Sequence, residues 1–349
     1  SALACSTCRD YELIVVDDGS SDDSLELARK HGAQVINLRE EGGRKKEEGR
    51  SLRSLGPAAA RNLGARCAKG EILLFLDSDV EARPDTLAQV AAAFERDPGL
   101  SAAFGSYDAA PAERNFLSQY KNLFHHYIHQ NGAERAATFW AGCGAVRREA
   151  FWRVGGFDAP AYRRPSIEDI DFGYRLNRAG GQIALLKSLQ VKHLKKWTLR
   201  SLLRADILDR GVPWTRLLWR ESLLPQPGDG PARLALNLQR ANRVSVALAY
   251  ALALGGALAL GSAHWRLPLL FALAAGLAAL WRLNRGLYGF FLRERGRWFL
   301  LRALPCHWLY YLYNGVSFAI GTLAFFARPA RYRADAPRPA NENPPLFNG

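Results

Sequence analysis

Two aspartates separated by one residue follow a strongly apolar stretch in the N-terminal half of the chain. Ile72–Leu76 is a run of five apolar residues, and Asp77, Ser78 and Asp79 come directly after it. Such a run predicts a strand buried on both faces, and open α/β sheets bind ligands at the carboxyl ends of such strands. Two carboxylates there suit Mg²⁺ or Mn²⁺, which take substrate phosphates as further ligands. The alternative is a turn that is merely rich in aspartate.

A second group of acids lies at the start of a predicted helix. Ser166 is a favourable N-cap, and Glu168, Asp169 and Asp171 fall in the first turn, where the helix dipole stabilises negative charge. Helix-start chemistry therefore explains Glu168 and Asp171 in part without any function. Asp169 is also a candidate general base, since an ionised carboxylate beside a sugar-phosphate site could accept a proton from an attacking hydroxyl.

Polar side chains also follow two other predicted elements. The short strand Tyr11–Val16 ends in Asp17 and Asp18, which could hydrogen-bond the base and ribose of a nucleotide. The receiver domain of a response regulator also carries paired aspartates after a strand, so this segment alone leaves both interpretations open. The helix that begins near Pro57 has its positive end near the same crevice, which makes Arg61 a candidate contact for a base or phosphate.

Predicted helices and strands alternate through the rest of this region, as in an α/β fold with a mostly parallel sheet. The strand predicted at 139–146 contains Gly142, and its small residues suit the close approach of a ligand. A helical stretch at 111–135 contains three histidines without a carboxylate at helical spacing, so we predict a surface or acceptor-side helix rather than a metal site. These histidines are His125, His126 and His129.

Apolar runs dominate the C-terminal third. Residues 244–262 carry no charge and are about long enough to cross a bilayer. Residues 267–281 could form the second arm of a hairpin, and 304–327 make a third run. Soluble core helices are the alternative, although so many uncharged Ala, Leu and Gly residues would be unusual there. Upstream, 197–208 predicts an amphipathic helix that either lies in a membrane interface or packs on the preceding domain.

Composition limits the kind of partner. The net charge of +14 and the pI near 9.8 imply an anionic partner. Arginines concentrate after position 190, and we find no zinc finger, RNA-binding signature or basic helical arm, so lipid is favoured over nucleic acid. Residues 39–55 are almost wholly polar and predict a mobile surface loop. The chain contains no methionine, and we expect a fragment or a processed product.

The ordered set of segments resembles the family 2 glycosyltransferases, inverting enzymes with the GT-A fold. The resemblance covers roughly residues 10 to 200. The matching segments are Val15–Asp22, Gly56–Gly64, Leu76–Asp79, Gly155–Asp158 and Ile167–Leu176. A receiver domain explains neither the Asp77/Asp79 pair nor the helix that starts at Glu168 and Asp169, so the resemblance favours the transferase.

The resemblance implies a role for each candidate residue. Asp79 becomes the principal carboxylate for Mn²⁺ or Mg²⁺, with Asp77 supporting donor or metal. His193 falls where some relatives place another metal or diphosphate ligand, although a lone histidine is often structural. Asp169 becomes the base that deprotonates the acceptor hydroxyl. The residues expected to contact the nucleotide sugar are Asp17, Asp18, Arg61, Asp77, Ser78, Gly142 and Glu168.

Two features depart from the family pattern. The family normally opens with a strand and a Pro-x-Tyr-Asn-like turn before the Asp-Asp-Gly-Ser strand; that opening is absent here, and we expect truncation. The segment His193–Trp197, His-Leu-Lys-Lys-Trp, only faintly resembles the Gln-x-x-Arg-Trp motif of processive synthases, because both key polar positions differ. The sequence therefore leaves processivity open.

We expect a membrane-anchored, multi-pass bacterial enzyme of the inner, cytoplasmic membrane, with its catalytic domain in the cytosol. It would move a sugar from a UDP- or GDP-linked donor to a lipid-linked or polysaccharide acceptor. One alternative is a polyprenyl-phosphate glycosyltransferase, and another is a catalytically silent membrane module that binds nucleotide sugars. The predicted parts are a GT-A catalytic domain at 1–195, interfacial helices and a linker at 196–240, two or three transmembrane helices at 241–330, and a disordered tail at 331–349.

Overall fold

The computed structural model describes residues 6, 8–38, 54–222, 240–261 and 264–327. The predicted surface loop lies mostly outside these residues. Up to the last strand of the main sheet the elements are β1 Ile14–Asp17, α1 Ser24–Lys30, β2 Gln34–Asn37, α3 Pro57–Cys67, β3 Ile72–Leu76, β4 Val80–Glu81, α4 Thr86–Arg96, β5 Leu100–Tyr107, α5 Phe116–Gln130, β6 Arg135–Ala136, β7 Cys143–Arg147, α6 Arg148–Arg153, α7 Glu168–Arg178 and β8 Gln182–His193. The C-terminal elements are α8 Leu199–Arg204, the π-helix η2 Ala205–Gly211, α9 Val212–Ser222, α10 Arg240–Gly261 and α11 Arg266–Ala327.

The main sheet has the order β3-β7-β5-β8-β4, with β6 paired to β8. β5 and β8 pair in parallel, whereas β7 is antiparallel to both β3 and β5. The strands β3, β5 and β8 therefore run in one direction, and β7 runs in the opposite direction between β3 and β5. β1 and β2 form a separate parallel pair in the described residues. This is the mostly parallel α/β architecture that the sequence predicts.

Hydrophobic clusters cover both faces of the sheet. Along β3, Leu73 and Phe75 join one cluster, while Leu74 and its alternating neighbours pack against the other. The side chains of a strand alternate between its faces, so a strand between two cores must be apolar throughout. The prediction of a strand buried on both faces is confirmed for Ile72–Leu76.

Helix α3 joins the small sheet to the main one. Gly64 faces Val16 of β1 so closely that an added Cβ would lie 3.2 Å from the valine side chain. On its other side, the amide of Asn62 donates to the carbonyl of Phe157 and accepts from its N–H, at 2.7 and 2.9 Å. The middle of α3 is thereby held between β1 and the loop after α6.

The histidine-bearing helix α5 is not a surface helix. Its aromatic residues pack into one cluster with residues of α11, and His129 is buried against Phe104 of β5. His126 contacts the carbonyl oxygen of Tyr107 at 2.7 Å through Nδ1. The predicted surface position is therefore wrong, because the apolar C-terminal segment covers a face that sequence analysis assigned to solvent.

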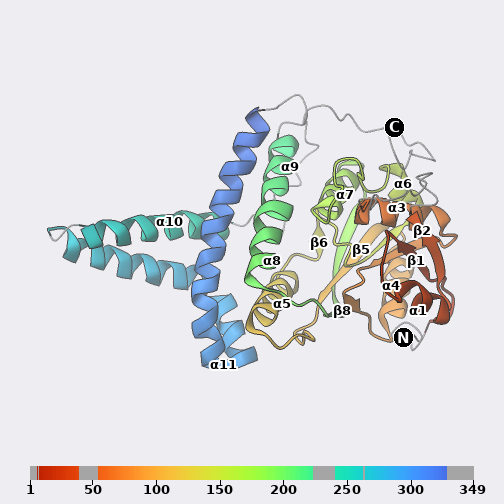
Figure 1. The fold of residues 1–349 in the computed structure, drawn as a ribbon, viewed down its shortest axis with the longest axis horizontal. Helices are drawn as coiled ribbons and strands as arrows, with labels where there is room; N and C mark the ends of the chain where they lie inside the picture. Colours follow the sequence, from red (N-terminus) through yellow and green to blue (C-terminus); the bar gives the residue numbers. More distant parts are fainter. Residues whose placement is uncertain (1–5, 7, 39–53, 223–239, 262–263, 328–349) are drawn as a thin grey trace.

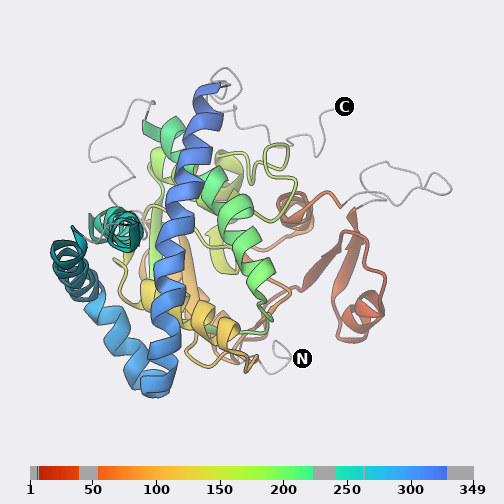
Figure 2. The ribbon, with the colours of Figure 1, turned by 60° about the vertical axis from the view of Figure 1, so that its left-hand side comes forward.

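The segment after the main sheet packs between the sheet-containing domain and α11, where Figures 1 and 2 show α8, α9 and the last part of α11 side by side. A buried polar cluster joins these layers. The Lys121 ammonium of α5 lies 2.6 Å from both carboxylate oxygens of Asp206 in η2. The Tyr313 hydroxyl of α11 donates to the same carboxylate at 2.6 Å.

The apolar helices extend away from this body. α10 and the first part of α11 run together as a hairpin (Figure 1), and α11 bends at Gly296, whose φ is 79°. Ala241–Gly261 and Arg266–Ala327 are long and apolar enough to cross a membrane, by length and composition. The predicted second and third apolar runs thus lie in two helical parts of α11, on either side of the break at Gly296.

Candidate active site

Arg61 links the two carboxylate centres that the sequence identifies. Its Nη2 lies 2.6 Å from Asp77 Oδ1, and its Nη1 lies 2.7 Å from Glu168 Oε1. Three elements therefore meet here: α3, the end of β3 and the start of α7. Burial lowers the pKa of Arg61, but Asp77 and then Glu168 and Asp169 outweigh this and raise it. The guanidinium is thus a permanent positive charge among these carboxylates.

The pKa of the Asp169 carboxyl group is strongly raised in the folded protein. Burial first, and then the negative charge of Glu168, raise the pKa of Asp169 to about 7. Arg61 and a hydrogen bond from the Ala141 N–H, 3.1 Å from Asp169 Oδ2, oppose this rise. A carboxylate with such a pKa is a stronger base than an ordinary aspartate, and about half of it is ionised near neutral pH.

Asp79 and His193 approach each other where β4 pairs with the end of β8. His193 Nε2 lies 3.9 Å from Asp79 Oδ2, and Lys195 Nζ lies 3.3 Å from the same oxygen. Burial lowers the pKa of His193 to about 4 against the opposing charge of Asp79, so its imidazole is neutral, as a metal ligand must be. The His193 ring also stacks on Tyr107, with ring centroids 4.0 Å apart.

These two side chains fit part of a divalent metal site. A carboxylate oxygen and a neutral imidazole are ligands that Mn²⁺ accepts, and donor phosphates would supply further oxygens. Asp77 is turned toward Arg61 instead, so the structure does not bring it together with Asp79 and His193. Within the described part of the chain, no group of three or more His, Cys, Asp or Glu residues forms a ready-made metal cluster.

The paired aspartates after β1 hold the neighbouring loop. Asp18 accepts hydrogen bonds from the backbone N–H groups of Leu55 and Gly56 at 3.0 and 2.8 Å, and also from the Ser54 hydroxyl. Asp17 is buried and accepts a bond from the Ser20 N–H at 2.8 Å. Both carboxylates therefore shape the entrance to α3, whichever groups of a ligand they also contact.

Ser78 and Gly142 lie close to the aspartate pair in different ways. Ser78 is exposed in the turn between Asp77 and Asp79. The Gly142 carbonyl accepts a bond from the Asp77 N–H at 3.2 Å. A Cβ at Gly142 would lie 2.8 Å from the indole nitrogen of Trp140, which is too close for any side chain. Gly142 is thus required for packing, and its backbone positions Asp77.

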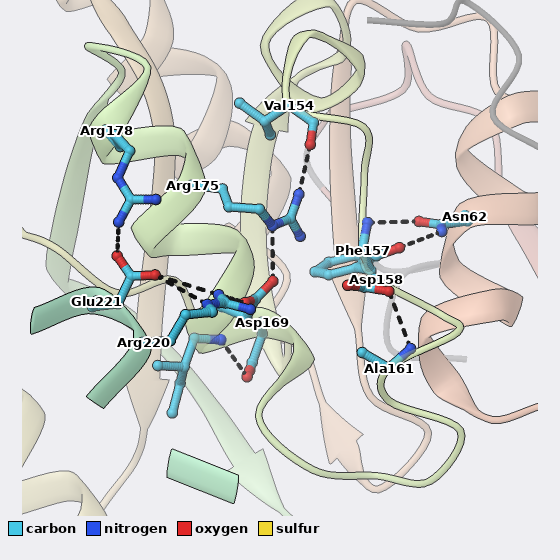
Figure 3. Close-up of polar contacts among 12 residues, drawn as sticks. Asn62, Val154, Phe157, Asp158, Ala161, Asp169, Arg175, Arg178, Arg220 and Glu221 are labelled. Atoms are coloured by element: carbon cyan, nitrogen blue, oxygen red, sulfur yellow. Dashed lines mark hydrogen bonds and ion pairs between the residues drawn. The ribbon is translucent and has the colours of Figure 1, made fainter. Parts of the chain in front are cut away.

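Asp171 belongs to an ion-pair network rather than to the site. It is fully buried, accepts from Arg175 Nε at 2.8 Å and also pairs with Arg220 of α9. Figure 3 shows Arg220, Glu221 and Arg178 continuing this network away from Asp169. The helix-start explanation for Asp171 is therefore incomplete, because its charge is balanced by two arginines.

Two groups beside the site were missed by sequence analysis. Arg210 of η2 lies close enough to the carboxylates that Asp206 and then Tyr107, Asp169 and Asp77 raise its pKa against the effect of burial. Tyr107 ends β5 at the edge of the sheet where β3 also ends, so its position after an apolar strand was a usable signal. Arg210 offered none, because it reaches the site only through the packing of η2.

Comparison with known proteins shows what this fold resembles. Residues 1–155 match the family model described as glycosyl transferase family 2. Validoxylamine A glucosyltransferase from Streptomyces hygroscopicus subsp. jinggangensis is 28% identical over 200 residues, covering 49% of this chain and 45% of the relative. A poly(ribitol-phosphate) beta-glucosyltransferase from Bacillus spizizenii is 40% identical over 70 residues, 20% of this chain and 10% of the relative.

The fold is also found among solved structures. A mannosyltransferase from Pyrobaculum calidifontis, in complex with GDP-Man and Mn²⁺, superposes with a TM-score of 0.55 at 20% identity, covering 91% of this chain and 81% of that chain. Residues 1–155 therefore resemble the family 2 glycosyltransferases, and the chain has the GT-A fold. It spans about half the length of the first curated relatives that it matches.

Proposed function

We propose that this protein is a membrane-anchored, metal-dependent, inverting glycosyltransferase of the inner membrane with a cytosolic catalytic domain. It transfers a sugar from a UDP- or GDP-linked donor to a lipid-linked or glycan acceptor. The observation that carries the proposal is the bridge from Arg61 to Asp77 and Glu168, which joins the end of β3 to the start of α7. The names of the relatives, which are glycosyltransferases, support the same reaction class.

The site divides the work of transfer among its residues. Asp169 takes the proton from the acceptor hydroxyl as that oxygen attacks the anomeric carbon from the side opposite the leaving diphosphate. Its raised pKa suits this role, because the ionised Asp169 carboxylate binds a proton more tightly than an ordinary aspartate does. Arg61 orients Asp77 and Glu168 and supplies positive charge near the donor phosphates.

Asp79 and His193 would hold the divalent cation. Such an ion supplies positive charge that stabilises the departing nucleoside diphosphate. Lys195, which is paired with Asp79, adds a further positive charge at the same place. Tyr107 stacks on His193 and fixes the plane of its ring, so the imidazole nitrogen is oriented before any ligand arrives.

Calorimetric binding tests the donor half of this proposal. UDP, GDP and their sugars are titrated into the detergent-purified protein with and without Mn²⁺. We expect binding that requires the metal and is lost in Asp79→Ala, with Asp23→Asn, an exposed aspartate, as the control. If no nucleotide binds to this chain or to a form extended at its N-terminus, the transferase assignment is wrong.

Turnover by Asp169→Asn tests the catalytic half. Loss of a general base typically lowers the rate by about 10²–10⁴-fold, while donor affinity is expected to stay within about threefold because Arg61 and Asp79 remain. The parent chain, with Asp169 intact, is also tested against a panel of lipid and glycan acceptors. If it binds the donor but turns over none of these acceptors, it is instead the catalytically silent module. Retained turnover in Asp169→Asn would contradict the role of Asp169 as the base.

A further inference from the structure

A groove rich in arginine opens beside the candidate active site. It has a volume of about 1150 Å³ and lies between the loop 158–166 and the helices α8, η2 and α9. Two aspartates, Asp158 and Asp209, are the acids that line it. The arginines that line it number six: Arg163, Arg164, Arg200, Arg204, Arg216 and Arg220. The groove walls therefore carry an excess of positive charge.

Several of these arginines are not neutralised. Arg220 is committed to Asp171 and Glu221, and Arg204 reaches Asp209 at 3.9 Å. Arg163, Arg164 and Arg200 are exposed, and within the described ranges none of the three has a carboxylate within 4.0 Å. Two walls of one groove thus present unpaired guanidinium groups, whose planar donors match the geometry of phosphate oxygens.

The floor of the groove is continuous with the catalytic helix. The Ser166 hydroxyl donates to the carbonyl of Asp209 at 2.5 Å, which joins the loop to η2. The N–H of the same serine donates to the Glu168 carboxylate at 2.9 Å. Glu168 in turn binds Arg61, and Asp169 is the next residue. Ser166, which lines the groove, is therefore three residues before the proposed base in the sequence.

The groove also faces the apolar part of the molecule. Leu208 lines it and is 60% exposed, and Leu199, beside Arg200 in α8, is 52% exposed. α9 contacts both the groove and α11: Arg216 lines the groove, and the Trp219 indole, one turn further along α9, donates to Thr322 of α11 at 2.9 Å. Positive charge and exposed leucines thus adjoin on helices that pack against a candidate membrane helix.

We propose that this groove binds the phosphate group of a lipid acceptor, with the lipid chain lying along the exposed leucines. The inference rests on the proposed transferase function and narrows its acceptor to a phosphate-bearing lipid. Binding the phosphate in the groove restrains the acceptor beside Asp169, which raises its local concentration at the site. A soluble phosphate polymer would use the same charges but would have no need of Leu199 and Leu208.

Binding of dodecyl phosphate to the full-length chain in a neutral detergent tests the proposal. Dodecanol and inorganic phosphate serve as comparison ligands that lack either the charge or the chain. We expect dodecyl phosphate to bind at least tenfold more tightly than either. The variant Arg163→Gln/Arg164→Gln/Arg200→Gln should lose at least tenfold in that affinity, since it removes three unpaired charges without breaking an ion pair.

A matched control removes three positive charges from a distant surface. Arg29→Gln/Lys30→Gln/Arg96→Gln changes exposed residues of α1 and α4 and should bind dodecyl phosphate within about twofold of the parent. Equal losses in both triple variants, or no loss in the groove variant, would overturn the proposal. So would a soluble phosphodiester polymer that binds the groove more tightly than dodecyl phosphate does.

Donor binding in the same samples separates this proposal from the one on which it rests. Metal-dependent nucleotide binding should be unchanged in the groove variant, because Arg163, Arg164 and Arg200 do not contact Asp79 or His193. Nucleotide binding without dodecyl phosphate binding would refute the groove as the acceptor site and leave the transferase intact. Absence of nucleotide binding in the parent chain and in its N-terminally extended form would instead refute the transferase.

Discussion

Replacing Asp169 with asparagine is expected to stabilise the protein in alkaline solution while it removes the proposed base. Burial and the neighbouring Glu168 raise the pKa of Asp169 from 3.8 to about 7. A carboxyl group whose pKa is raised by folding holds its proton more tightly in the folded state. The folded protein therefore loses stability as the pH rises from about 4 to about 7, and above pH 7 the full cost of the buried charge is present.

The size of this cost follows from the two pKa values. The difference between 3.8 and about 7 corresponds to about 4 kcal/mol, because each tenfold change in an acid dissociation constant is about 1.4 kcal/mol. Titration shared with Glu168 and solvent screening reduce it, so we expect Asp169→Asn to gain about 1–3 kcal/mol at pH 8. That gain corresponds to a rise in melting temperature of about 2–4 °C per kcal/mol.

Thermal unfolding of the full chain in neutral detergent, followed by tryptophan fluorescence from pH 5 to pH 8, measures this effect. At pH 5 less than half of the ionisation cost has developed, so the advantage of Asp169→Asn should be about half as large or smaller. Asp23→Asn, at an exposed position without a side-chain cap bond, should show no pH-dependent advantage. A stability difference that is the same at every pH, or a variant less stable at pH 8, would refute the reasoning.

Three further predictions concern packing and ligands. Lys121→Met should lower the free energy of unfolding by about 3–5 kcal/mol, because the buried Asp206 loses its ion-pair partner and keeps only the Tyr313 hydroxyl and the charge of Arg210. The double variant with Asp206→Leu should recover most of this stability in thermal unfolding, and a double variant as unstable as the single one would contradict the prediction. Gly173→Ala should lower the free energy of unfolding by about 1–3 kcal/mol in the same assay, since the added Cβ would lie 2.7 Å from a backbone carbon. Gly256→Ala, where the added Cβ meets open space, should not destabilise the protein, and equal effects of the two substitutions would contradict the prediction. His193→Ala should raise the Mn²⁺ concentration needed for half-maximal nucleotide binding by at least about tenfold in calorimetry, and an unchanged requirement would exclude His193 as a ligand.

The sequence predicts the parts of the site that depend on local pattern. Ile72–Leu76 is apolar throughout and is followed at once by aspartates, so both the strand and its functional end could be located. Arg61 follows a helix start that has to lie near the same crevice, and the structure places its guanidinium between Asp77 and Glu168. In each case, the hydrophobic pattern of one element and the residue at which it begins or ends are enough to locate the polar side chain.

The remaining features depend on contacts between distant segments. Arg220 reaches Asp171 across 49 residues because α9 returns to α7, and no local pattern announces that return. His129 becomes buried because α5 packs against β5 and Trp140, which its polar neighbours in the sequence do not suggest. Such pairings are decided by the packing of whole layers, which sequence periodicity does not determine.

The buried cluster around Asp206 shows that α11 is packed into the body of the protein. A buried carboxylate is tolerated only when its charge and lone pairs are satisfied. Here the Lys121 ammonium of α5 balances the charge of Asp206, and the Tyr313 hydroxyl of α11 donates a hydrogen bond to the same carboxylate. The π-helix that carries Asp206 therefore requires both neighbours. That same π-helix carries Asp209, whose carbonyl binds Ser166 beside the catalytic helix. The position of the candidate membrane helix and the geometry of the active site are therefore joined through one short segment of chain.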